Sequence, residues 1–491
     1  MTAALPAYSN HIGGASRPAI GGGWLDSTDP ATGRVWARVP DSGPEDVAEA
    51  VAAARRAFPE WRAHSPARRA AALRRWAQTV GEHAEDLART ESRDNGRVLR
   101  ETRGADLPGG ALHIEYNAGL ADKTAGETVD LGGTASVSTF YEPYGVVGVI
   151  LPWNAPLAMF FAKVSAALAA GNTVVVKPAE QACCSVLAGC ALLEEAGLPP
   201  GAVNVVAGTG ERAGEALVLH PDVAKVHFTG STATGRRVTE LSAEGLTDLS
   251  LELGGKSPCI VFDDADLDAA ADGAAGAIYT GGAGQSCVAA SRLLVQDSVF
   301  EEFTARLRDR ARALRVGAPA SPGTDMGPIA FAEQYRKVLS YLELGPKEGA
   351  ETVFGGRHGP DALSEPDPDL SEGYWVEPTL FAAEDNGLRI CQEEIFGPVT
   401  VALPFSTEEE AYAVANDTGY GLAGGAWTRD LARARRAVAA IDAGTVWINT
   451  FRRLHWAVPF GGRKQSGNLP SNGRDALREW LTLKAAWIEP G

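Results

Sequence analysis

The spacing of hydrophobic residues changes along the chain and separates segments of different predicted structure. Residues 19–40 alternate apolar and polar positions among Gly, Pro and Asp, which predicts edge strands and turns. Further on, apolar side chains recur every three or four positions, and Ser65 followed by Pro66 is typical of a helix start. We therefore expect helices over about 42–61, 65–90 and 106–120, and then an antiparallel hairpin in 123–142.

From Gly145 onward, short apolar runs alternate with helical segments. The runs that predict buried strands are 146–151, 173–178, 203–206, 225–228, 249–253, 259–262 and 293–295. One of the intervening helices is expected over 266–280. Strands that alternate with helices at this spacing form parallel sheets, and the series restarts just after residue 254. The predicted fold class is therefore α/β, with two parallel-sheet lobes.

The composition narrows the class of protein. The chain has 491 residues, 45% of them hydrophobic and 22% charged, which is typical of a globular protein of about three domains. Its 45 basic and 62 acidic residues give a net charge of −17, so we expect neither a nucleic-acid nor a membrane partner. The longest apolar run, residues 155–162, is too short to span a bilayer.

The six cysteines point to a reducing compartment. None belongs to a C-x-x-C pair and none lies at metal-ligand spacing from a histidine, which predicts free thiols, no metal site and a cytoplasmic location. Cys287 follows a run of small residues, GGAGQS. If Cys287 opened a helix, the helix dipole would lower its pKa and make the thiol nucleophilic. A buried thiol that acts only as a small hydrophobic group is the commoner case for a single cysteine.

Glu252 is a candidate general base. It lies between Leu251 and Leu253 at the end of a predicted strand, and two glycines follow at the boundary of the lobes. Partial burial would raise the pKa of this carboxyl toward the value that a general base needs. The alternative is a glutamate at a strand end that points to solvent.

Four further segments could hold a nucleotide. Gly208-Thr209-Gly210 and Phe228-Thr229-Gly230-Ser231-Thr232 each follow a strand, and a glycine- or serine-rich turn that opens a helix can bind a pyrophosphate. Lys177 and Glu180 emerge at the end of another strand, where a ribose diol could bind. The fourth segment, 393–398, combines two acids with Phe396. Taken singly, these segments read as turns, a helix cap, a solvated strand end and a loop.

Together these segments give a resemblance to the aldehyde dehydrogenase superfamily that runs from Gly21 through Trp487. The similar stretches follow the family order: PWN at 152–154, VVVKPAE at 174–180, FTGST at 228–232, LELGGKSP at 251–258, GQSC at 284–287, EEIFGP at 393–398 and PFGGRKQSG at 459–467.

The resemblance implies oxidation of an aldehyde with NAD(P)⁺. Cys287 would be the nucleophile that forms a thiohemiacetal and then a thioester, Asn154 and the Cys287 N–H would form the oxyanion hole, and Glu252 would activate water. NAD is expected over NADP, because the charge of Glu180 would repel a 2′-phosphate. The implied cofactor residues are Trp153, Lys177, Glu180, Gly210, Gly230, Ser231, Leu253, Gln334, Glu394 and Phe396.

The resemblance also suggests where the aldehyde binds. The tunnel would be lined by Ala155, Met159, Ser286, Val288, Leu454, Trp456 and Phe460. Ala155 and Ala162 stand where the family often carries bulky aromatics, so we expect a wide apolar tunnel and an apolar or aromatic aldehyde. The alternative is a carboxylated semialdehyde, selected by Arg452, Arg453 and His455 if they reach inward.

The family fold has two Rossmann-like lobes and a small β arm for oligomerisation. The resemblance implies an NAD-binding domain in 1–122 and 143–254, a catalytic domain in 255–465, and an arm in 123–142 and 480–491, with a homodimer or homotetramer as the assembly. One stretch departs from the family: Asn468-Leu469-Pro470-Ser471 stands where Gly-Arg-Glu is common. The departure puts the packing of that loop near the tunnel or the subunit interface in doubt.

Three rival functions remain open at this stage. The CoA-acylating branch of the family typically lacks a glutamate at position 252, so this chain does not fit it. A non-enzymatic binding or structural relative would be expected to have lost Cys287 or Glu252. A cysteine hydrolase would need a histidine partner, which the sequence does not identify. An assay for reduced nicotinamide separates an enzyme from a binding protein.

Overall fold

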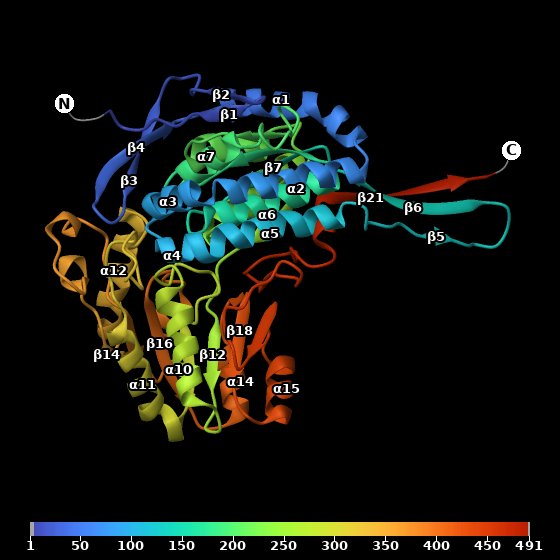
Figure 1. Cartoon of the computed structure of the whole chain (residues 1–491). Coiled ribbons are helices and arrows are strands. Elements are labelled where there is room, and N and C mark those ends of the chain that lie inside the picture. Colours follow the sequence, from blue (N-terminus) through green and yellow to red (C-terminus); the bar gives the residue numbers. More distant parts are fainter. Residues whose placement is uncertain (1–3, 490–491) are drawn as a thin grey trace.

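In the computed structural model, which describes residues 4–489, the chain folds into two α/β lobes and a projecting β arm (Figure 1). Each lobe is built on a seven-stranded, mostly parallel sheet. The arm is a separate three-stranded antiparallel sheet that extends away from the lobes. The predicted α/β class with two parallel-sheet lobes is confirmed.

The first lobe contains the sheet β11-β10-β7-β8-β9-β1-β2. Its strands, in that order, are Asp248–Glu252, Lys225–Thr229, Val146–Ile150, Thr173–Lys177, Val203–Val205, Asn10–Ile12 and Ala15–Arg17. From β7 the chain adds β8 and β9 on one side and then returns to add β10 and β11 on the other. The carboxyl ends of β7 and β10 are therefore a topological switch point, where α/β sheets bind ligands.

Helices cover this sheet because their apolar faces need burial. The larger ones are α1 (Pro44–Ala63), α2 (Pro66–Glu82), α3 (Ala84–Asn95), α5 (Leu107–Leu120), α6 (Pro156–Ala170), α7 (Cys184–Ala191) and α9 (Thr232–Gly245). Trp76 of α2 packs edge-on against Phe160 and Phe161 of α6, with ring centroids 5.7 Å apart. A separate ribbon, β3 (Trp24–Asp29) and β4 (Arg34–Pro40), occupies the predicted edge-strand region.

The second lobe contains the sheet β14-β15-β16-β13-β12-β18-β19. Its strands, in that order, are Glu351–Phe354, Thr379–Ala382, Val399–Phe405, Arg292–Gln296, Pro258–Val261, Ala423–Trp427 and Thr445–Ile448. Its main helices are α10 (Leu267–Ala275), α11 (Phe300–Ala313), α12 (Ala332–Lys347), α14 (Glu408–Asn416) and α15 (Leu431–Ala440). The arm consists of β21 (Leu481–Ile488), β6 (Ser136–Pro143) and β5 (Thr128–Val129).

Two predicted helices differ from the structure in detail. The helix expected over 65–90 is broken at His83, whose backbone N–H caps the end of α2 by bonding to the carbonyls of Thr79 and Gly81. Ser65 caps the start of α2 as predicted, accepting from the N–H of Arg68 at 3.3 Å. The helix expected over 266–280 ends at Ala275 and continues as a π-helical turn, Gly276–Thr280.

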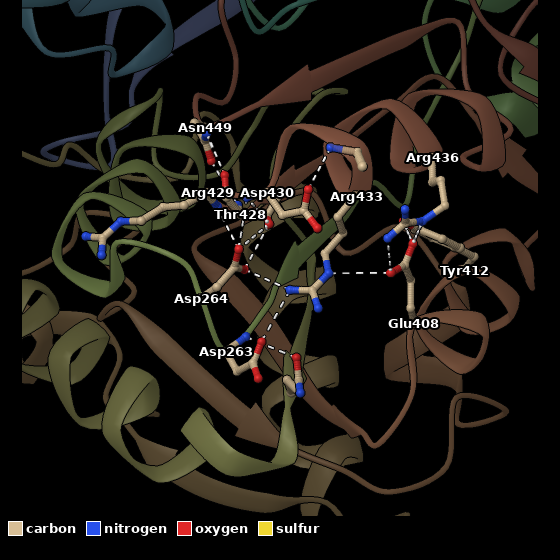
Figure 2. Close-up of polar contacts among 12 residues, drawn as sticks. Asp263, Asp264, Glu408, Tyr412, Thr428, Arg429, Asp430, Arg433, Arg436 and Asn449 are labelled. Carbon is tan, nitrogen blue, oxygen red and sulfur yellow. Dashed lines mark hydrogen bonds and ion pairs between the residues drawn. The ribbon is translucent and has the colours of Figure 1, made fainter.

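An ionic network ties α14 and α15 to the end of β12 in the second lobe (Figure 2). Arg433 of α15 bonds to Asp264 at 2.9 Å and to Glu408 at 3.4 Å, and its guanidinium lies 4.6 Å from the ring centroid of Phe262. Glu408 also pairs with Arg436, at 2.6 Å. The network fixes helices at the end of the lobe that Figure 1 shows farthest from the first lobe.

Three properties concern only residues 4–489. No helix in this range is long and apolar enough to cross a membrane. Nor does the range hold a group of three or more His, Cys, Asp or Glu side chains placed to bind a metal ion. The six cysteines, all of which fall inside it, are free thiols.

Candidate active site

Cys287 lies in a turn that leads into β13, and its loop joins three of the predicted segments. Gly284 adopts a left-handed φ of 71°, and a Cβ there would lie 2.1 Å from the carbonyl oxygen of Gly397, so a side chain does not fit. The Cys287 loop therefore packs directly against segment 393–398. Asn154 Nδ2 donates to the Gln285 carbonyl at 2.9 Å, which brings the PWN segment to the same loop.

The expectation of a lowered pKa for Cys287 is wrong in this structure. Cys287 lies in a turn and does not open a helix, so no helix dipole acts on its thiol. Burial, and then the negative charges of Glu394 and Glu252, raise the pKa of the thiol to about 12, although Arg452 acts in the opposite sense. At neutral pH the thiol is therefore protonated in the absence of further positive charge.

Glu252 is the last residue of β11 and is buried, with 5% of its surface exposed. Its Oε1 accepts from Lys163 Nζ, on α6, at 2.5 Å. The prediction that its pKa is raised is wrong: burial does raise the pKa, but the charges of Lys163 and His227 outweigh burial and hold it below its usual range. Glu252 is therefore a carboxylate at neutral pH, which is the form that can accept a proton from water.

Glu252 belongs to a closed ring of hydrogen-bonded side chains, here called the Glu252 ring: Glu252, Lys163, Ser471, Glu479, His227 and Thr229. Lys163 Nζ also donates to Ser471 Oγ at 2.8 Å, and Ser471 Oγ donates to Glu479 Oε2 at 2.9 Å. Glu479 Oε1 lies 2.7 Å from His227 Nδ1, and His227 Nε2 lies 3.0 Å from Thr229 Oγ1. Thr229 Oγ1 lies 3.4 Å from Glu252 Oε2 and closes the ring.

Sequence analysis missed most of this ring, although two signals were available. Lys163 is the only charged residue in the apolar helix α6, and His227 alternates with Thr229 along a buried strand. Ser471 belongs to the stretch that departs from the family, and the structure shows how that stretch is accommodated. Asn468 bonds to the backbone of Leu251 at 2.8 Å, and Ser471 forms a two-way backbone bridge with Phe460.

The nucleotide segments meet at the carboxyl edge of the first sheet. Lys177 ends β8 and forms an ion pair with Glu180 at 2.6 Å, and the Gly210 backbone N–H bonds to the Glu180 carboxylate. On the other side of β7, Gly230 and Ser231 follow β10, and Ser231 Oγ caps α9 by accepting from the N–H of Thr234. This arrangement at the switch point fits a dinucleotide, because the open helix end suits a pyrophosphate and the carboxylate suits a ribose diol.

The remaining cofactor candidates surround segment 393–398. Glu394 Oε1 accepts from the Gly255 N–H at 2.9 Å, and a Cβ on Gly254 would lie 2.5 Å from its carboxylate. Gln334 Nε2 donates to the carbonyls of Ile395 and Phe396, at 2.9 and 2.8 Å, so it supports the loop itself.

An aromatic group lies beside this loop. The Trp153 ring is edge-on to Phe396 at 5.1 Å and to Phe331 at 5.0 Å. Leu253 is buried next to Gly235 of α9, where a Cβ would lie 2.6 Å from its side chain. These contacts hold the side chains of Trp153, Phe396 and Leu253 in place, and their contact with a cofactor stays a prediction.

The predicted tunnel residues fall into two groups, one packed in or against hydrophobic clusters and the other more exposed to solvent. Val288 is buried, Phe460 packs with Cys287 against one apolar cluster, and Met159 packs against the core of the first lobe. Ala155, Ser286 and Trp456 are half-buried, whereas Leu454 is 56% exposed.

Arg452, Arg453 and His455, the residues that would select a carboxylated semialdehyde, differ in their exposure to solvent. Arg453 and His455 are exposed. Arg452 is half-buried, and its guanidinium occupies the space beside Gly281, where a Cβ would lie 1.2 Å from it. Of the three, Arg452 is the one whose charge is known to act on Cys287, where it lowers the pKa of the thiol.

Comparison with known proteins finds relatives over nearly the whole chain. The model of the aldehyde dehydrogenase family matches residues 21–486. The chain is 45% identical over 485 residues to acetaldehyde dehydrogenase 2 of Cupriavidus necator, covering 97% of this chain and 94% of that protein. It is 40% identical over 481 residues to 2-aminomuconic semialdehyde dehydrogenase of Danio rerio, covering 98% of each.

A solved structure gives the same result. The structure of an indole-3-acetaldehyde dehydrogenase in complex with NAD⁺ superposes with a TM-score of 0.95 at 38% identity, covering 100% of this chain and 98% of that one. The three relatives are named for three different aldehydes, so they do not decide the substrate. The agreement over nearly the whole length, in sequence and in fold, shows that the chain belongs to the aldehyde dehydrogenase family.

Proposed function

We propose that this aldehyde dehydrogenase oxidises an apolar or aromatic aldehyde to the carboxylic acid with NAD⁺. The observation that carries the proposal is the convergence of Cys287, Asn154 and Glu252: Asn154 bonds to the Cys287 loop, and Glu252 is near enough for its charge to raise the pKa of the thiol. A nucleophile, an oxyanion donor and a base are the groups that acyl chemistry through a thioester requires.

In this mechanism the Cys287 thiol first loses its proton to water, and the thiolate sulfur then adds to the carbonyl carbon of the aldehyde. The Asn154 amide and the Cys287 backbone N–H stabilise the oxyanion. When bound, NAD⁺ supplies the acceptor for the hydride that leaves the thiohemiacetal carbon. Glu252 then takes a proton from water, the water oxygen attacks the resulting thioester, and the carboxylic acid is released as the Cys287–carbon bond breaks.

Glu180 and Lys177 support a preference for NAD over NADP. Glu180 is a carboxylate at the ribose position of the nucleotide region, and the charge of Lys177 contributes to a pKa of Glu180 below its usual range even though burial raises it. The negative charge would repel a 2′-phosphate, while Lys177 at 2.6 Å softens the repulsion. The expected result is a preference for NAD rather than an exclusion of NADP.

The apolar substrate class rests on the surroundings of Cys287. The thiol and Phe460 pack on one hydrophobic cluster that includes Val288. The family resemblance puts Ala155 and Ala162 along the tunnel, and their small side chains would leave it wide. An aromatic ring gains about 0.5–1.5 kcal/mol from aromatic contacts beyond its burial, and each buried methylene adds about 0.8 kcal/mol. Acetaldehyde would leave this space unfilled.

The alternative, a carboxylated semialdehyde, is favoured by one observation, the position of Arg452. However, Arg452 and Arg97 both lie beside Glu101 and Asp106, whose negative charges act on Arg452. Two cations and two anions already balance one another there, so Arg452 does not need the carboxylate of a substrate. We therefore place the semialdehyde second.

The test compares kcat/KM for benzaldehyde and hexanal with kcat/KM for acetaldehyde and succinic semialdehyde. The proposal expects the larger apolar aldehydes to lead. If succinic semialdehyde leads by about tenfold or more, and Arg452→Met removes that lead while the exposed control Arg453→Met does not, the apolar assignment is wrong.

We also propose that the β arm joins copies of the chain into a dimer or tetramer. The arm projects from the lobes (Figure 1), and it carries exposed large apolar side chains: Val129, Leu131, Phe140, Leu483, Trp487 and Ile488. Apolar surface of this kind on a projecting sheet is typical of an interface. Light scattering should show an oligomer that Trp487→Asp weakens; a monomeric wild type would contradict this.

We propose a cytoplasmic location as well, because six free thiols are typical of a protein in a reducing compartment.

A further inference from the structure

The segment between β11 and β12 touches both the Cys287 loop and the segment 393–398. A Cβ on Gly255 would lie 2.4 Å from the carbonyl oxygen of Cys287, and a Cβ on Gly254 would lie 2.5 Å from the carboxylate of Glu394. No side chain fits at either glycine, so the backbone itself makes these contacts. The position of this segment therefore affects the nucleophile loop and a candidate for cofactor binding together.

Lys256, the next residue, binds the backbone of the segment 393–398. Its Nζ donates to the Glu393 carbonyl at 2.7 Å, and the Gly255 N–H donates to Glu394 Oε1 at 2.9 Å. Two successive residues of one segment thus hold two successive residues of the other. Arg292 Nε donates to the Lys256 carbonyl at 3.2 Å, so the main chain of the lysine is itself held in place.

Packing alone does not account for a lysine at position 256. The residue is 1% exposed, and removing its amine from water lowers stability, whereas a methionine would fill nearly the same volume without that cost. Burial lowers the pKa of Lys256 to about 7, although the charge of Glu394 acts in the opposite sense. The ammonium and the neutral amine both carry N–H groups, so either form can donate to the Glu393 carbonyl. The hydrogen bond is therefore present on both sides of neutral pH.

The loop that Lys256 holds has an unfavourable backbone conformation. Phe396 adopts a left-handed φ of 60°, which a residue with a large side chain rarely does. Gln334 Nε2, from α12, donates to the carbonyls of Ile395 and Phe396 at 2.9 and 2.8 Å. Side chains from two different elements thus hold the carbonyls of this loop. The bond from Lys256 is the one next to Glu394, whose carboxylate suits the hydroxyls of a ribose.

We propose that Lys256 is a positioning residue for hydride transfer, because its hydrogen bond to the Glu393 carbonyl fixes Glu394, and with it the nicotinamide ribose, relative to Cys287. The proposal rests on the proposed oxidation of an aldehyde with NAD⁺ and on the expected binding of the ribose by Glu394. Hydride transfer needs a short and fixed distance between donor and acceptor, and a displacement of about 1 Å can slow such a step by roughly a hundredfold. Formation and hydrolysis of the thioester from an activated ester need no nicotinamide, so they depend less on this bond.

The test separates hydride transfer from the chemistry of the acyl group. Lys256→Met removes the hydrogen bond at nearly constant volume, and Lys256→Gln keeps an N–H donor on a side chain one atom shorter. Lys347→Met, at an exposed lysine of α12, is the control for the change from lysine to methionine. p-Nitrophenyl acetate measures the acyl chemistry alone: its acetyl group passes to the Cys287 sulfur, nitrophenolate leaves, and water then releases acetate.

Single turnovers, with enzyme in excess over benzaldehyde and with saturating NAD⁺, measure the formation of NADH. We expect Lys256→Met to slow this rate by about tenfold or more, and Lys256→Gln to lie between Lys256→Met and the wild type. The slowed rate should fall further with benzaldehyde deuterated at the carbonyl carbon, because the hydride step limits it. Hydrolysis of p-nitrophenyl acetate should stay within about twofold of the wild type in both variants. Lys347→Met should match the wild type in both assays.

Three results overturn the role of Lys256. The first is a single-turnover rate of Lys256→Met within about twofold of the wild type. The second is an equal loss in both assays, because a merely structural lysine would damage both. The third is a slowed rate without an isotope effect, which would place the loss at the addition of the thiol. If only one variant folds, the same criteria apply to that variant.

Failure of the proposed function gives a different result. A wild type that forms no NADH from benzaldehyde, hexanal, acetaldehyde or succinic semialdehyde would contradict the proposed function itself. An active wild type beside an equally fast Lys256→Met refutes the role of Lys256 alone.

Discussion

Lys163 and Glu252 form a buried ion pair, with Nζ and Oε1 2.5 Å apart and the side chains 4% and 6% exposed. The pair joins the middle of α6 to the end of β11. The cost of removing both charges from water offsets much of their attraction, so a pair of this kind adds little net stability. Its effect is to keep Glu252 ionised and fixed at the edge of the sheet, beside Thr229.

Replacing Lys163 by Met should move the pH profile of turnover. The Lys163 charge lowers the pKa of Glu252, so without it that pKa rises and the acid limb of kcat shifts to higher pH. On that limb turnover falls because more Glu252 is protonated. Profiles of kcat against pH, with the exposed Lys347→Met as control, check this; an unmoved acid limb would argue against the pairing.

Glu252→Gln should separate the two halves of the reaction. An amide cannot accept the proton of water, so hydrolysis of the thioester slows by about a hundredfold or more, while acylation and hydride transfer continue. Rapid mixing should show a full burst of NADH followed by a slow steady state. A steady-state rate equal to that of the wild type would remove Glu252 as the base.

The fold could be predicted further than the site. Short apolar runs such as 146–151 identify buried strands, because a strand covered on both faces has no polar positions. The charge state of the site could not be predicted in the same way. The pKa of Cys287 depends on Glu394 and Glu252, and that of Glu252 depends on Lys163 and His227, all distant in sequence. The sheet register and the packing of α6 bring these groups together, and neither can be read from a local window.

Cys287→Ala should abolish dehydrogenase turnover, because no other group can form the thioester. The side chain shrinks by one sulfur in a half-buried turn, so folding and the binding of NAD⁺ should change little. Turnover and the quenching of protein fluorescence by the cofactor are measured together. Cys391→Ala, which removes a buried thiol from the same lobe, is the control. Turnover of Cys287→Ala within about tenfold of wild type would refute its role.

Glu180→Gln should narrow the preference for NAD. Two like unit charges at about 4 Å repel by about 1 kcal/mol in water, so removing the Glu180 charge should raise kcat/KM for NADP by roughly fivefold. The ratio of kcat/KM for the two cofactors is the measurement. Glu211→Gln, an exposed carboxylate near the same region, should leave the ratio unchanged. An unchanged ratio in Glu180→Gln, or a wild type that prefers NADP, would contradict the assignment.

The network around Arg433 should make the second lobe sensitive to acid. Hydrogen bonds from Arg436 and Tyr412, with the nearby charge of Arg433, lower the pKa of Glu408 to about 2 against the effect of burial. A carboxyl whose pKa is lower in the folded state stabilises the fold above its unfolded pKa of about 4.3, and the contribution is lost as the pH falls toward 2. Because Arg436 is 54% exposed, solvent screens the pair and the contribution should be about 1 kcal/mol.

Glu408→Gln should therefore lower the free energy of unfolding by about 1 kcal/mol at pH 7, and its difference from the wild type should vanish near pH 2. Thermal unfolding across this range, with the exposed neighbour Glu409→Gln as control, measures it. A difference that stays constant from pH 7 to pH 2 would show that the ionisation of Glu408 does not stabilise the lobe.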